Sequence, residues 1–192
     1  VRAIAGMVDL QRRFIGADAT ATTHRILIEE ETDETAYRRR FYVHAPFGRR
    51  VNDGLSRMVA HHCADRYDTN VSVAVADLGF TVGMPLNRHV ELASVLRSLA
   101  TADVRAELVA ALEGTDLLAK SFRINAARSL MILRRYKGTE RSAAQQQVSA
   151  EMLLSFAASL EDFAVIEETY REVLDDRLAT PRTAAILESI AT

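Results

Sequence analysis

The sequence predicts an α+β fold in which a small lobe of helices and β-hairpins, at about residues 1–85, precedes an all-helical lobe at residues 86–192. Short runs of β-branched and aromatic residues, bounded by turn residues, occur before Pro85. After Pro85 every segment has apolar residues at helical spacing. Hydrophobic residues make up 48% of the chain, enough for a sizeable core. We expect the two lobes to share that core as one integrated domain.

The elements of the first lobe follow from local periodicity. Apolar residues at Ile4, Val8 and Phe14 predict a helix over residues 1–15. The acidic turn TDET separates two strand-like runs, and Gly79 turns the chain between two more, so two hairpins are predicted. Pro46 and Gly48 end the first hairpin. The expected elements are strands at 24–30 and 39–44, a helix at 51–67, and strands at 70–76 and 80–82.

Capping residues divide the second lobe into five or six helices. Thr101 or Asp103 is the expected N-cap of one helix, which Gly114 ends, and Thr115 or Asp116 is that of the next. Thr180 before a proline opens the last helix. The expected helices span residues 87–100, 103–113, 115–136, 142–160, 163–174 and 180–192.

Composition excludes several classes of protein. The net charge of −2 is incompatible with a histone-like cationic surface, although a local basic face can still bind phosphates. Cys63 is the single cysteine, which excludes an intramolecular disulfide and a cysteine-based zinc site and fits a reducing cytoplasm. No apolar run approaches the roughly 18 residues of a transmembrane helix. Without a signal peptide or an initiator Met, the sequence is expected to be a piece of a longer chain.

No catalytic or metal-binding motif is present in the sequence. It lacks GxxxxGK[ST], GxSxG and HExxH. His61 and His62 are adjacent, which points their side chains about 100° apart on a helix, whereas a zinc pair needs i,i+4 spacing. We therefore assign no catalytic residue and no metal ligand. A base-excision enzyme using Glu168 or Asp175 to activate water is the weakest of the alternatives, because no acid, base and pocket converge in the sequence.

The most informative segment is basic and runs from residue 120 to residue 141. On a helical wheel, the apolar residues gather on one side: Leu118, Phe122, Ala126, Leu133 and Tyr136. The cations spread over the opposite half, where a polyanion would relieve their mutual repulsion. Pairing with Glu167, Glu168, Asp175 or Asp176 on neighbouring helices is the alternative. The candidate nucleic-acid-binding residues here are Lys120, Arg123, Arg128, Arg134, Arg135, Lys137 and Arg141.

A second basic site is expected at Arg49 and Arg50, immediately after Gly48 at a helix N-terminus. Backbone N–H groups and the helix dipole favour a phosphate there. The alternative is that both arginines are solvated near the acidic cluster of residues 29–34.

Four blocks of the sequence resemble, in order, the region that follows the motor domains of large helicase-related (Lhr) helicases, also called a DEAD/DEAH-helicase-associated domain. The blocks are HAPFGRRVN (44–52), FRINAARSLMILRRYKG (122–138), AAQQQVSAEMLL (143–154) and ETYREVLDD (168–176). A fainter likeness extends to residues 8–10 and 24–29.

The resemblance implies part of a superfamily-2, ATP-dependent DNA helicase that unwinds duplexes in DNA repair. Two RecA-like domains and a winged helix would precede this region, and ATP and Mg²⁺ would bind in those motor domains. The expected partners are single-stranded DNA, or a DNA or RNA duplex with a single-stranded tail, and the other domains of the polypeptide. The basic helix would line the channel for the strand, with Tyr136 able to stack on a base. The alternative is a structural brace without nucleic-acid contact, supported by the apolarity of residues 117–133.

Overall fold

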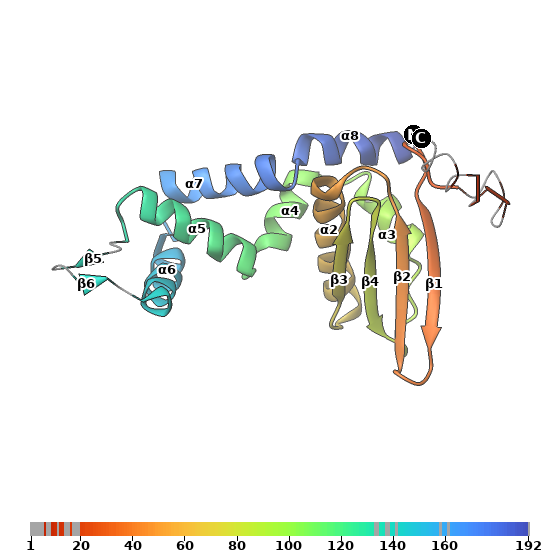
Figure 1. Cartoon of the computed structure of the whole chain (residues 1–192), viewed down its shortest axis with the longest axis horizontal. Helices are drawn as coiled ribbons and strands as arrows, with labels where there is room; N and C mark the ends of the chain where they lie inside the picture. Colours follow the sequence, from red (N-terminus) through yellow and green to blue (C-terminus); the bar gives the residue numbers. More distant parts are fainter. Residues whose placement is uncertain are drawn as a thin grey trace.

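The computed structural model confirms the α+β class: a four-stranded antiparallel sheet lies at one end and an arm of helices extends from it (Figure 1). Of the helix predicted over residues 1–15, the described positions 6, 9–10 and 12–13 are helical. Ile4, Val8 and Phe14, whose spacing predicts this helix, lie outside the described residues. No helix in the described part of the chain is long and apolar enough to cross a bilayer. The structure describes residues 6, 9–10, 12–13, 16, 20–132, 135–136, 139–140, 142–157, 159–160 and 162–191.

Both predicted hairpins are present and join into one sheet. Strands β1 (Leu27–Asp33) and β2 (Arg38–His44) form the first, and β3 (Ser72–Ala76) and β4 (Gly79–Pro85) form the second. The strand order is β1-β2-β4-β3, with every neighbouring pair antiparallel. In the acidic turn the Asp33 carboxylate accepts a hydrogen bond from the backbone N–H of Ala36.

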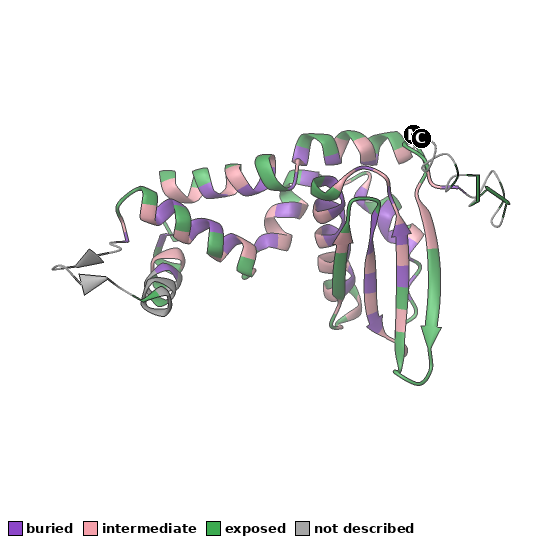
Figure 2. Ribbon diagram, in the orientation of Figure 1, coloured by how far each residue is buried: buried purple, intermediate pink, exposed green. Residues whose placement is uncertain are grey.

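One face of the sheet packs against helices to form the main core. Phe41 pairs with Val82 and Val43 with Phe80, and all four are buried on this face. The core also contains Leu174 and other residues from the C-terminal part of the chain, so residues on both sides of position 85 share it (Figure 2). The contributing helices are α2 (Arg49–Tyr67), α3 (Leu92–Leu99), α4 (Val104–Leu112), the π-helix η2 (Glu172–Arg177) and α8 (Thr180–Ala191).

The arm has a second, smaller core. Helices α5 (Asp116–Arg128), α6 (Ala143–Ala157) and α7 (Ala164–Arg171) meet around Phe122, Ala126, Ile132, Ala150 and Ala157. In Figure 1 helix α4 lies between this arm and the sheet, and α8 runs across the top of the sheet toward the C-terminus. The predicted N-caps Asp103 and Thr115 are confirmed, since their side chains accept hydrogen bonds from first-turn N–H groups of α4 and α5.

The helix predicted over residues 115–136 is wrong, because α5 ends at Arg128. Leu130 adopts a left-handed conformation (φ 62°), and the N–H groups of Leu130 and Met131 bond back to the carbonyls of Ala127 and Ala126. This is a Schellman motif, which closes a helix by satisfying its last carbonyls. Short strands β5 (Arg135–Tyr136) and β6 (Thr139–Glu140) then pair in a hairpin.

Leu130→Gly is expected to raise the free energy of unfolding by up to about 1 kcal/mol, because glycine adopts the left-handed conformation without strain. Little packing is lost, since Leu130 is 77% exposed. Urea unfolding followed by circular dichroism measures the change. Leu130→Ala is the matched control: it keeps the strained Cβ and should leave the stability unchanged. A glycine variant no more stable than the alanine variant would contradict the assignment.

Candidate nucleic-acid interface

Three of the predicted cations lie together on the outer side of α5. At 3.6 residues per turn, Lys120, Arg123 and Arg128 fall within an arc of about 140°, opposite the buried residues of the helix. Lys120 and Arg128 are exposed and Arg123 is half-buried. Ile124, on the same arc, is 38% exposed, so this helix is buried on one side only. The basic side of α5 therefore faces solvent.

Among the described residues, no carboxylate of α7 or η2 forms an ion pair with these three cations. Arg171 pairs with Glu168 (2.7 Å) and Asp176 (3.6 Å), while Asp175 pairs with Arg105 (3.3 Å). Lys120 instead lies 3.6 Å from Asp116 on its own helix, with both groups well exposed. An exposed i,i+4 pair of this kind contributes only about 0.3–0.5 kcal/mol.

Arg128 is oriented by a polar cluster between α5 and the start of η2. Its Nη1 lies 3.5 Å from the Asn125 side-chain oxygen. The Asn125 amide in turn donates to Thr169 (3.2 Å) and Glu172 (3.1 Å). Asn125 is only 7% exposed, so this contact fixes α5 against α7 and η2.

The other cations of the basic segment lie beyond the helix. Arg135 belongs to β5, at the tip of the arm (Figure 1), and Tyr136 follows it in the same strand. Arg134, Lys137 and Arg141 lie outside the described residues. Their role in binding nucleic acid, and the stacking role of Tyr136, stay predictions.

Arg49 and Arg50 form a separate site at the first two positions of α2. Both are exposed, and no acidic residue occurs in the first turn of the helix. The acidic strand β1 pairs with other residues: Glu29 with His44, Glu30 with Arg39 and Glu31 with Arg40. The structure does not bring this pair together with the cations of α5, which lie on the arm (Figure 1).

The start of α2 is held in place by Asn52, the last residue of the HAPFGRRVN block. Asn52 is fully buried, and its Nδ2 lies 2.9, 3.0 and 3.1 Å from the carbonyl oxygens of Ala45, Ala76 and Asp77. The N–H of Gly48 also donates to the Asp77 carbonyl. These bonds attach the β2–α2 loop to the β3–β4 turn and so position Arg49 and Arg50.

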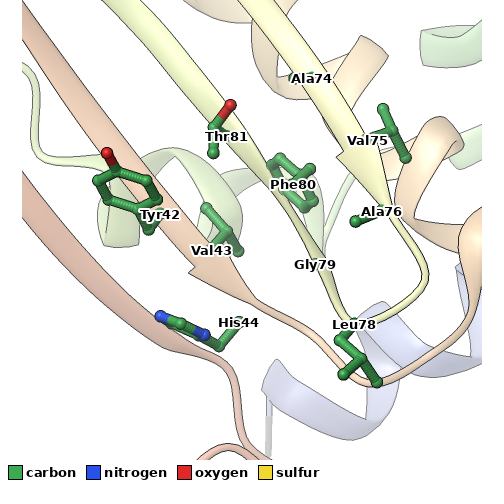
Figure 3. A pocket seen from close by; sticks show the side chains of 10 residues that line it. All are labelled: Tyr42, Val43, His44, Ala74, Val75, Ala76, Leu78, Gly79, Phe80 and Thr81. Carbon is green, nitrogen blue, oxygen red and sulfur yellow. The ribbon is translucent and has the colours of Figure 1, made fainter.

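The open face of the sheet carries a shallow hollow of about 310 Å³ that the sequence interpretation missed. Figure 3 shows Tyr42 and His44 on β2, beside Thr81 on the neighbouring strand. The Tyr42 hydroxyl donates to Glu31 (2.7 Å), and the His44 ring lies 2.7 Å from Glu29. Tyr42 and His44 alternate with apolar residues in RFYVH, and Glu29 and Glu31 lie on the same face of the paired strand. This alternation is the signal that could have identified the face.

Two carboxylates and a thiol with nucleophilic or acid–base potential are paired or buried. Hydrogen bonds from Arg171 lower the pKa of Glu168, which keeps this carboxylate charged and paired. Asp175 pairs with Arg105. Burial raises the pKa of the Cys63 thiol to about 11 and keeps it protonated. Among the described residues, no three His, Cys, Asp or Glu side chains gather as a metal site.

Known proteins resemble this chain over most of its length. It is 42% identical to the ATP-dependent helicase Lhr-Core of Methanothermobacter thermautotrophicus over 79% of the chain, and 33% identical to that of Methanocaldococcus jannaschii over 98%. These alignments span only 18% and 22% of the two relatives, about a fifth of their length.

A solved structure, Mycobacterium smegmatis helicase Lhr bound to ssDNA and AMP-PNP, matches 86% of this chain and 21% of that chain. The TM-score is 0.73 and the sequence identity 27%. The model of the DEAD/H associated family matches residues 20–192. These findings confirm the predicted likeness to a region of Lhr helicases. The chain belongs to the DEAD/H associated family.

Proposed function

We propose that this chain is an accessory region of an Lhr-type ATP-dependent DNA helicase and guides single-stranded DNA during translocation and unwinding in DNA repair. The observation that supports it most directly is the solvent-facing basic side of α5, whose cations are not paired with the carboxylates of α7 and η2. Such a surface binds phosphates without reading sequence. The likeness to a helicase solved with ssDNA supports the same function.

The remaining functions of the helicase are assigned to other parts of the polypeptide. This sequence has no phosphate-binding loop, so ATP and Mg²⁺ are assigned to RecA-like motor domains, which together with a winged helix are the proposed intramolecular partners. The single cysteine fits a cytoplasmic helicase. Single-stranded DNA, or a duplex with a single-stranded tail, is the proposed ligand.

The test is a triple charge reversal, Lys120→Glu, Arg123→Glu and Arg128→Glu, in the full-length helicase. Each phosphate contact on a single strand contributes about 0.7 to the slope of log K against log salt, so the slope should fall by up to about 2. Affinity for single-stranded DNA at low salt should weaken at least about tenfold, since one decade corresponds to about 1.4 kcal/mol. Fluorescence anisotropy over a salt series measures both quantities.

The matched control reverses three exposed arginines of the main body, Arg66, Arg97 and Arg182, and so changes the net charge equally. This control should retain the affinity and slope of the parent helicase. The proposal fails if the triple variant of α5 binds like the parent, or if both triple variants weaken binding equally. Equal weakening would indicate a nonspecific effect of net charge.

A further inference from the structure

Helix α6 exposes a row of large apolar side chains. Its other side is buried in the arm through Ala150 and Ala157 and, in part, Leu153 and Leu154. The exposed row recurs at every fourth residue and continues into the turn after the helix. The exposed fractions are 58% for Val148, 70% for Met152, 63% for Phe156 and 42% for Leu160. We call these four residues the α6 ridge.

The composition and geometry of the α6 ridge indicate a helical partner. Between residues 143 and 157 the sequence has one charged residue, Glu151. Side chains spaced by four form the inclined ridge that packs into the groove of another helix. A contiguous apolar patch of this kind on a monomer commonly marks an interaction site.

The area of the ridge argues against a second copy of the chain as its partner. Four such side chains expose on the order of a few hundred Å². A stable complex between separate proteins buries about 800 Å² on each partner. A smaller patch is sufficient when both surfaces belong to one polypeptide, because tethering gives an effective concentration in the millimolar range.

We propose that the α6 ridge docks into an apolar groove between helices of another domain of the same helicase polypeptide. The relatives are about five times as long as this stretch, and the solved Lhr chain is matched over 21% of its length, so most of such a helicase lies beyond this region. The docked ridge would attach the arm to the rest of the helicase. This contact does not depend on the binding of single-stranded DNA.

Thiol accessibility in the full-length helicase tests the proposal. Phe156→Cys and Val148→Cys are made separately, so each variant keeps three of the four ridge residues. Leu78→Cys is the control, since Leu78 is 68% exposed in the β3–β4 turn. Peptide mass spectrometry gives the alkylation rate at each site in the folded protein. This rate is compared with the alkylation rate of the same thiol in denaturant. Cys63 is buried and its raised pKa suppresses its reaction.

Without DNA, the ridge thiols should react at least about tenfold more slowly than the control thiol, relative to their denatured rates. Adding Met152→Asp to the Val148→Cys variant should release the ridge and restore fast reaction. Equal rates at the ridge and control positions would overturn the proposal. If the protection disappears on dilution and sedimentation shows a dimer, the ridge binds a second copy and the proposal is overturned. Protection that requires single-stranded DNA would also overturn the proposal.

Discussion

Asn52→Ala is expected to lower the free energy of unfolding by about 3 kcal/mol, because the buried carbonyl of Ala45 loses its donor, two part-buried bonds are lost as well, and the amide leaves a cavity. The Asn52 amide lies within 3.1 Å of the carbonyls of Ala45, Ala76 and Asp77, at a position with no exposed surface. Solvent cannot replace the missing donor at the buried carbonyl of Ala45. Urea unfolding followed by circular dichroism measures the loss.

The matched control is Asn87→Ala, in an exposed turn, which should change the stability by less than about 0.5 kcal/mol. A second consequence is local. Without Asn52, the β2–α2 loop is less firmly attached to the β3–β4 turn, so hydrogen exchange at the start of α2 should accelerate more than exchange in the centre of the sheet. An Asn52→Ala variant as stable as the parent would show that the loop is held by other contacts.

The regular parts of the fold were predictable because local patterns determine them. Alternating residues in RFYVH place Phe41 and Val43 on the buried face, and the TDET turn sets the first hairpin. The caps at Asp103 and Thr115 were also correct, since a side-chain oxygen at an N-cap acts within a few residues.

The end of α5 was not predictable from its residues. Leucine seldom adopts a left-handed conformation, so nothing at Leu130 signals a helix end, and the apolar periodicity of the sequence continues through Leu133. Helical geometry therefore applies to this segment only as far as Arg128. The helical periodicity of the sequence also places Val148, Met152 and Phe156 on one face. Spacing alone does not show whether that face is buried, and the structure leaves it exposed.

Charge was predictable, and pairing was predictable only within one helix. The cations of the basic segment and the i,i+3 pair of Glu168 and Arg171 on α7 are local features of the sequence, whereas the partner of Asp175 depends on how η2 lies against α4. The structure shows these carboxylates paired with Arg171 and Arg105, which leaves the basic side of α5 to solvent. Long-range pairing of this kind requires the tertiary fold.

Asn125→Asp is expected to destabilise the arm by about 3 kcal/mol at pH 7, because it places a second carboxylate against a partly buried one. Asn125 now donates to Glu172 across 3.1 Å. In the variant that hydrogen bond becomes a repulsion between like charges, and Thr169 loses its donor. The contact between α5 and η2 should therefore open.

The pH dependence identifies the cause. Two carboxylates in contact raise the pKa of one of them in the folded state above its unfolded value. The folded variant then binds more protons than the unfolded chain, so its stability falls as pH rises through the raised pKa, and the recovery on acidification is complete by about pH 4, the unfolded pKa of a carboxyl group. Asn125→Ala, the matched control, removes the hydrogen bonds without adding charge, and its loss of stability should vary little with pH. Urea midpoints between pH 4 and pH 8 separate the two variants, and parallel curves would show that Glu172 does not face position 125.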